Sequence, residues 1–196
     1  MYKIALTGQA NSGKNTAAKI LVKKIKEYDK DCNSHQFIAF ADPIKQMAHT
    51  AFPEIPRKWL YGASKFRSEI IPGAFKDGDP LTVRRLLIDL GNDFGRKYDS
   101  NIWINNFKLS LRKAQNKNIN IIIVPDCRRI NELNILKSLN FFNIKILRNK
   151  QSSINDASET EQNAIPDSEF DFIINNIGSK NDLKKIIEQI IPKLSV

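Results

Sequence analysis

A glycine-containing segment near the N-terminus has the residue types and spacing needed to bind phosphate. It begins at Gly8 and reaches Gly13, which is followed at once by Lys14 and, two residues later, by Thr16. Glycines allow a tight turn whose backbone N–H groups face phosphate oxygens, and the N-terminus of a following helix adds its partial positive charge. Lys14 would then reach the β- and γ-phosphates of a nucleoside triphosphate, and the Thr16 hydroxyl would ligate Mg²⁺. The alternative, a chance turn before a helix, leaves the lysine and the hydroxyl unexplained.

This loop predicts an ATP site. Its members are Gly8, Ala10, Asn11, Ser12, Gly13, Lys14, Asn15 and Thr16. The hydroxyl stands one place later than in most such loops, because Asn15 follows the lysine. That spacing favours small-molecule kinases over GTPases.

A second group of chemically active residues follows the apolar segment 119–124, where Asp126 precedes Arg128 and Arg129. Ligands of open α/β sheets bind beyond the carboxyl ends of the strands, so all three are placed to meet substrate. Asp126 could hold the Mg²⁺ shell, and guanidinium groups match phosphate geometry. We therefore expect Lys14, Asp126 and Arg128 to be catalytic and Thr16 and Asp126 to serve the metal. The alternative is a solvated Asp–Arg pair that caps the next helix.

Apolar segments of strand length alternate with helix-patterned segments, which predicts an α/β fold with five mainly parallel strands flanked by helices. The strands are expected at residues 2–7, 37–41, 119–124, 143–147 and 170–174. Helices are expected at residues 13–28 and after Ser179, where Leu183, Ile187 and Ile190 recur on one side.

The chain of 196 residues is expected to form one domain over residues 1–196, with two excursions from the sheet. Residues 42–117 form a mostly helical insertion that prolines and glycines interrupt, and the polar residues 149–168 have the composition of a lid. No apolar segment approaches the length of a membrane span, and we expect a cytoplasmic protein.

The net charge of +10 suits a site for several phosphates as well as a nucleic acid, but the chain has no dense basic arm. Nucleic acid is therefore not an expected partner, although a nucleic-acid-stimulated NTPase remains the alternative from another class. Cys32 and Cys127 lack metal-ligand spacing and are expected to be reduced thiols.

Several further segments resemble phage-type deoxynucleoside monophosphate kinases, and together they cover nearly the whole chain. They are the segment Ala-Asp-Pro-Ile-Lys at 41–45, residues 82–96, Asn101-Ile102-Trp103, Asp126-x-Arg128-x-x-Asn131-Glu132, Ser158-Glu159 and Asn176-x-Gly178. The resemblance implies a P-loop kinase core, ATP and Mg²⁺ as cofactors, and conversion of a deoxynucleoside monophosphate to its diphosphate. The resemblance does not decide whether the protein forms a homodimer.

The resemblance also implies the residues of the acceptor site and of the lid. Asp42, Lys45, Arg84 and Trp103 would line or support the acceptor pocket, and Ser158 and Glu159 would belong to the lid. Arg67 and Arg129 are added as acceptor-binding candidates because a guanidinium group matches phosphate geometry, not because of the resemblance. Four of these residues have a structural alternative. Asp42 could be a helix N-cap, Trp103 could be part of the core, and Arg67 and Arg84 could be solvated.

The chain departs from the family pattern where Asn15 replaces a frequent Asp and Ile88 a frequent Gln. Both changes could alter acceptor choice. Arg129 stands where an aromatic residue is frequent, and it better fits the animal-type phosphomevalonate kinases, which the chain also resembles. Phosphomevalonate kinase is therefore the alternative within the kinases.

Overall fold

The computed structural model describes residues 1–148, 161–162 and 164–194. The chain forms two compact units. The core unit contains Met1–Ala39 and Phe107–Val196, and the insertion unit contains Phe40–Asn106. Ser158 and Glu159, which we expected in a lid, lie outside the described residues.

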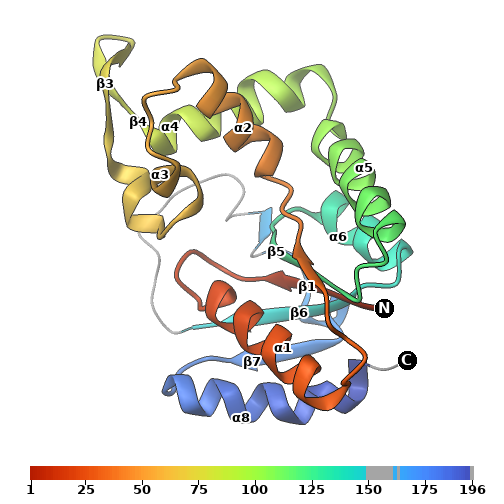
Figure 1. The fold of residues 1–196 in the computed structure, drawn as a ribbon. Helices are drawn as coiled ribbons and strands as arrows, with labels where there is room; N and C mark the ends of the chain where they lie inside the picture. Colours follow the sequence, from red (N-terminus) through yellow and green to blue (C-terminus); the bar gives the residue numbers. More distant parts are fainter. Residues whose placement is uncertain (149–160, 163, 195–196) are drawn as a thin grey trace. The chain divides into compact units, whose positions relative to one another are not determined.

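The core unit is built on a parallel sheet of five strands, as the sequence predicts (Figure 1). The strands are β1 (Tyr2–Thr7), β2 (His35–Phe37), β5 (Ile121–Cys127), β6 (Phe142–Leu147) and β7 (Phe172–Asn175), and their spatial order is β2-β5-β1-β6-β7. All four pairings are parallel. The first strand is therefore central, with β5 on one side and β6 on the other.

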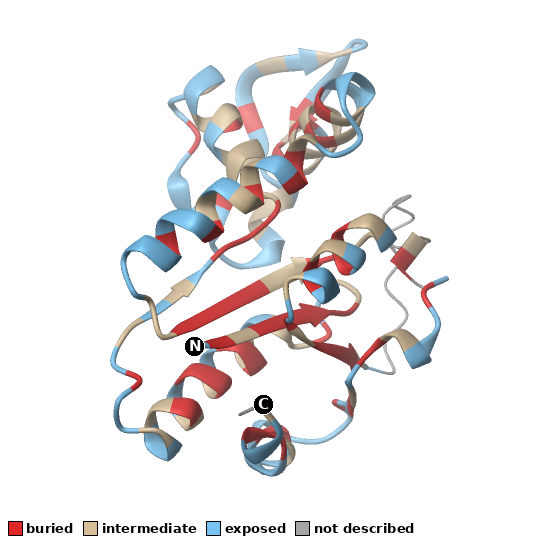
Figure 2. Cartoon of the chain, turned by 90° about the vertical axis from the view of Figure 1, so that its right-hand side faces the viewer, coloured by how far each residue is buried: buried red, intermediate tan, exposed pale blue. Residues whose placement is uncertain are grey.

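Helices cover the sheet, which explains why its central strands carry continuous apolar segments rather than alternating ones. The first four residues of β5 are completely buried (Figure 2). The helices α1 (Lys14–Tyr28) and α8 (Lys180–Ile190) pack together against the sheet, with Leu21, Ile25 and Ile187 in their shared core. Further helical elements of this unit are the C-terminal part of α5 (Ile102–Asn116), α6 (Ile130–Ser138), η3 (Asp167–Glu169) and η4 (Ile191–Leu194).

Several predicted strand boundaries were wrong. The second strand ends at Phe37, and the apolar residues Ile38, Ala39 and Phe40 that follow are buried without continuing it. Burial of a connecting segment therefore gave the same apolar pattern as a strand. The third strand continues to Cys127, and the fifth begins only at Phe172.

The insertion unit is less helical than the sequence suggested, because it contains an antiparallel hairpin. Its elements are α2 (Asp42–Ala51), α3 (Arg57–Tyr61), η1 (Ser64–Ser68), β3 (Ile70–Lys76), β4 (Asp79–Thr82), α4 (Val83–Ile88), η2 (Asp89–Arg96) and the start of α5. The hairpin turn consists of Asp77 and Gly78, which both have positive φ. An Asp-Gly pair favours this type I′ turn, so the sequence itself contains the signal for the hairpin.

Among the described residues, no helix combines the length and the apolar character that a membrane span requires.

Both cysteines are buried thiols. Burial raises the pKa of Cys32 to about 11, helped by the Asp29 carboxylate that accepts a hydrogen bond from its Sγ at 3.3 Å. Burial likewise raises the pKa of Cys127 well above its ordinary value, and the nearby Glu132 carboxylate adds to the shift. Because the thiolate is the reactive form, a raised pKa removes it near neutral pH.

We therefore expect the native protein to give almost no reaction with a disulfide reagent at about pH 8, where an exposed thiol is partly ionised. Both thiols should react once the protein is unfolded in guanidinium. Rapid labelling of either cysteine in the native protein would contradict the buried environments described above.

Candidate active site

The loop between β1 and α1 adopts the tight conformation that its glycines suggested. Gly13 has φ of 103° and Asn11 has φ of 62°, so both lie in the left-handed region. Gly13 is the N-cap of α1, and the first turn of that helix contains no acidic residue. The positive end of the helix dipole is therefore not neutralised from within its first turn.

Close contacts exclude side chains from both glycine positions. A Cβ on Gly8 would lie 2.4 Å from the Ile146 carbonyl oxygen, and a Cβ on Gly13 would lie 2.4 Å from Nδ2 of Asn176. Ser12 is buried between them, and its Oγ has no hydrogen-bond partner among the described residues. The loop thus contains a buried hydroxyl without a hydrogen-bond partner among the described residues. Because its two glycines have no side chains, a ligand could approach the backbone beside this hydroxyl closely.

Lys14 lies over this loop. Its Nζ donates to the carbonyl oxygens of Gly8 and Gln9, the latter at 2.7 Å. The ammonium group is thereby held at the residues that would surround phosphate. Thr16 follows in the first turn of α1 and is half-buried, whereas Asn15 is exposed.

Asp126 and Arg128 lie at the same edge of the sheet as this loop, because β5 runs parallel to β1. The register pairs Thr7 with Cys127, so Asp126 belongs to the end of the strand. The sequence predicted that Asp126 follows the strand. Because β5 continues to Cys127, Asp126 is instead one of its last residues. Asp126 is half-buried.

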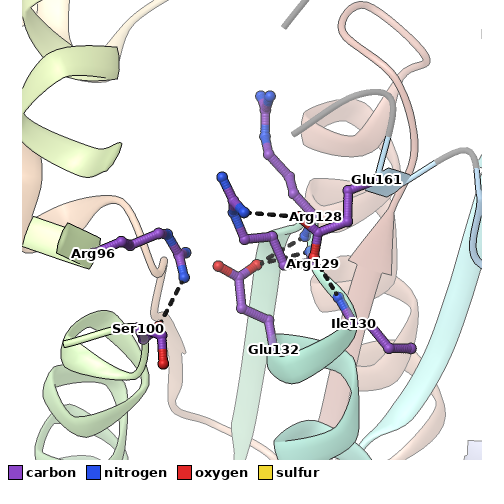
Figure 3. A network of polar contacts seen from close by, with 7 residues as sticks. All are labelled: Arg96, Ser100, Arg128, Arg129, Ile130, Glu132 and Glu161. Atoms are coloured by element: carbon purple, nitrogen blue, oxygen red, sulfur yellow. Dashed lines mark hydrogen bonds and ion pairs between the residues drawn. The ribbon is translucent and has the colours of Figure 1, made fainter. Parts of the chain in front are cut away.

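The start of α6 is capped by a residue to which the sequence analysis gave no role. The buried Glu132 carboxylate accepts hydrogen bonds from the backbone N–H groups of Arg128, at 2.9 Å, and Arg129, at 3.3 Å (Figure 3). Asp126 is therefore not needed as the cap that we considered for it. The Asp-x-Arg-x-x-Asn-Glu spacing contains the signal, since a glutamate at the third helical position commonly binds the N-cap N–H.

Arg129 forms an ion pair within the core unit. Its Nη1 donates to Oε2 of Glu161 at 2.7 Å, and the other oxygen of Glu161 accepts from the Ile130 N–H at 3.4 Å (Figure 3). The next residue, Gln162, donates from Nε2 to the Cys127 carbonyl oxygen at 3.2 Å. A carboxylate thus already faces the guanidinium that we expected to bind the acceptor, so Arg129 serves here to hold residues 161–162 against the end of β5.

Within the insertion unit, Asp42 and Lys45 are neighbours on the first turn of α2. Their side chains form an ion pair with an N–O distance of 3.0 Å. The N-cap of α2 is Ala41 rather than Asp42, so the capping alternative for Asp42 was wrong. Lys45 and Arg57 each lie 5.2 Å from the ring centroid of Tyr61. Burial raises the pKa of Tyr61, and the charge of Asp42 adds to this shift.

Trp103 is part of the core of the insertion unit. The side chain is 2% exposed, and its Nε1 donates to the Gly91 carbonyl oxygen at 2.9 Å. Its ring lies against Gly95, where a Cβ would be only 2.1 Å from Cζ2. Because the ring has no open face for a base, the expected stacking on the acceptor is not available to it. Trp103 instead supports η2, which is a π-helix.

The two other expected acceptor arginines lie in different surroundings. Arg67 is half-buried and donates from Nη1 to the Trp59 carbonyl oxygen, which ties η1 to α3. Arg84 is also half-buried, and within the described residues its guanidinium makes no hydrogen bond or ion pair. Its neighbour Arg85 pairs with Asp89, as does Lys76 from the hairpin. Of Arg67 and Arg84, Arg84 therefore has the guanidinium that is available for a ligand.

Comparison with known proteins gives the chain a family. The family model for deoxynucleotide monophosphate kinase matches residues 60–187, which is more than half of the chain. A relative from Acanthamoeba polyphaga mimivirus, named after the same family, is 29% identical over 157 residues that make up 76% of this chain and 75% of its own. The deoxynucleotide monophosphate kinase of enterobacteria phage T4 is 32% identical over 106 residues, or 54% of this chain and 43% of its own.

A solved structure, that of TT1252 from Thermus thermophilus, aligns over 100% of both chains with 15% identity and a TM-score of 0.48. The family match and the two viral relatives agree on the family of this sequence. The chain belongs to the deoxynucleotide monophosphate kinase family.

Proposed function

We propose that this protein transfers the γ-phosphoryl group of ATP to a phosphate oxygen of a deoxynucleoside monophosphate. The observation that carries the proposal is the loop at residues 8–16, where neither glycine can bear a side chain and Lys14 is held over the backbone. The family match begins at residue 60 and so does not include this loop. Two separate parts of the chain therefore support the same chemistry.

The loop residues fit the triphosphate. An unsatisfied Ser12 hydroxyl, a left-handed Gly13 and a helix N-terminus without an acidic residue in its first turn all favour an anion. Thr16 and Asp126 would hold Mg²⁺, since a hydroxyl and a carboxylate are oxygen donors of the kind that Mg²⁺ takes alongside phosphate oxygens and water. When bound, the metal would neutralise charge on the β- and γ-phosphates.

The reaction needs no covalent help from the protein. The bond between the γ-phosphorus and the β,γ-bridging oxygen breaks, a bond forms from the γ-phosphorus to the acceptor's phosphate oxygen, and ADP leaves. Phosphoryl transfer depends mainly on positioning and on neutralising negative charge. In this proposal Lys14 acts on the triphosphate and Arg128 on the transferring group.

In the insertion unit, the proposed acceptor site consists of cationic groups rather than of the indole that the sequence suggested. Lys45 and Arg57 lie on the Tyr61 ring, and Arg84 is available on α4. Cations of this kind suit the phosphate of the acceptor, and Asp42 beside Lys45 offers a hydrogen-bond acceptor for its sugar or base.

The direct test is ADP release from ATP and Mg²⁺ with each deoxynucleoside monophosphate offered separately. Ribonucleotides and phosphomevalonate serve as comparison acceptors, and added DNA or RNA should not stimulate release. Turnover with one or more deoxynucleotides supports the proposal and reveals the base preference. Turnover with phosphomevalonate alone, or stimulation by nucleic acid alone, would overturn the proposed acceptor.

Arg128→Ala should lower kcat at least about tenfold, because it removes one charge-assisted contact to the transferring phosphoryl group. Its backbone contact to Glu132 survives the change, so the start of α6 should remain intact. Arg112→Ala removes the same charge from an exposed position on α5 and is the matched control. Steady-state kinetics of the two variants decide the matter, and equal kcat values would exclude the role of Arg128.

A further inference from the structure

We infer that Asn176 is a positioning residue that fixes the orientation of the Ser12–Gly13 peptide in the phosphate loop. The inference rests on the proposed function, because it concerns the site where the triphosphate of ATP would bind. It assigns a task to a residue from the far end of the chain that is part of neither the loop nor the β5 edge.

Asn176 is itself held firmly. It follows β7 directly, and its backbone N–H donates to the Leu147 carbonyl oxygen at the end of β6 at 2.8 Å. Its side chain is buried, and Nδ2 donates to the Ser12 carbonyl oxygen, also at 2.8 Å. Since a carbonyl oxygen can only accept, the amide nitrogen must face the loop. The sheet thus presents a fixed donor to one carbonyl of the loop.

This contact determines where the next N–H points. In a planar trans peptide the C=O and the N–H point in opposite directions. Holding the Ser12 carbonyl toward Asn176 therefore directs the Gly13 N–H away from Asn176, to the other side of the loop. A phosphate oxygen on that side would receive the N–H without any rearrangement of the peptide, which lowers the cost of binding.

The same contact explains why residue 13 must be glycine. Besides its φ of 103°, a Cβ at Gly13 would come within 2.4 Å of Nδ2 of Asn176. The loop and Asn176 therefore fit each other as a pair. Moving the loop outward to make room for a side chain would break the hydrogen bond to Ser12.

Replacing Asn176 should weaken nucleotide binding rather than acceptor binding. Asn176→Leu keeps the volume but removes the donor, and the loss of one buried hydrogen bond should raise the Kd of a non-hydrolysable ATP analogue about five- to tenfold. The KM for the acceptor should not change. The exposed neighbour Asn175 supplies the control, and Asn175→Ala should bind the analogue like the wild type.

Asn176→Asp separates positioning from a merely structural role. A carboxylate would repel the Ser12 carbonyl, whereas the protonated acid can donate to it. Because position 176 is buried, the pKa of an aspartate there should be raised well above its ordinary value of about 4. The Kd of Asn176→Asp, divided by that of the wild type at the same pH, should therefore fall toward one as the pH is lowered from about 8 to 5.5. The corresponding ratio for Asn176→Leu should be independent of pH.

The experiment titrates the analogue into each purified protein without acceptor, and thermal unfolding confirms that each variant is folded. A pH-independent ratio for Asn176→Asp, or unchanged affinity in Asn176→Leu, would overturn the inference. Absence of analogue binding by the wild type would instead refute the proposed function.

If the variants do not fold, hydrogen exchange of the wild-type protein provides the second test. The side-chain amide of Asn176 should be protected, and fast exchange there would equally overturn the inference.

Discussion

Replacing Lys14 by alanine should reduce kcat for ADP release by at least about 10³-fold, the effect of removing a preorganised charged donor from a phosphoryl-transfer site. The lysine is the only cationic side chain between residues 8 and 18. Its Nζ already lies at the loop, where it donates to the carbonyl oxygens of Gly8 and Gln9. No other part of that loop can supply a compensating positive side chain.

Two further variants make this result specific to position. Lys19→Ala removes the same charge from an exposed site on α1 and should retain full activity. Lys14→Arg keeps the charge but replaces a compact ammonium with a planar guanidinium group. Its kcat for ADP release should therefore be much lower than that of the wild type. Activity of Lys14→Ala within about threefold of the wild type would remove Lys14, and with it the ATP site, from the proposal.

The largest effect on stability should come from Gly95→Ala. The added methyl would lie 2.1 Å from Cζ2 of Trp103, and three atoms of that ring would be closer than 3.0 Å. Trp103 cannot move aside easily, because it is buried and its Nε1 is bonded to the Gly91 carbonyl. Overpacking of this kind costs up to about 3 kcal/mol. We expect Tm to fall by roughly 6–12 °C.

Tryptophan fluorescence during thermal unfolding is the suitable measurement, since Trp59 and Trp103 both belong to the insertion unit. Gly91→Ala is the matched control on the same π-helix. Its methyl would meet only the end of the Ile44 side chain, at 3.2 Å, and should be tolerated better.

A double-mutant cycle tests the cause. The clashing atoms belong to the six-membered part of the indole, so Gly95→Ala should cost less in a Trp103→Phe background. Equal costs in the two backgrounds would show that the ring is not the obstacle.

The sequence alone determined the features that depend on local pattern. The segment from Gly8 to Thr16 predicted the turn and the start of α1, because tight turns and helix N-termini depend on neighbouring residues. The buried segment of β5 and the five parallel strands followed from apolar periodicity. The hairpin turn at Asp77-Gly78 could have been predicted in the same way.

The tertiary structure alone decided which side chains meet. Asn176 reaches Ser12 across 164 positions of the chain, and Arg129 meets Glu161 although the two are 32 positions apart. Trp103 and Arg129 were both candidates for the acceptor, and only their packing and ion pairing show that one is core and the other is engaged by a carboxylate. Such contacts depend on how strands and helices are brought together, and residue type and spacing in one sequence carry no direct signal of that arrangement.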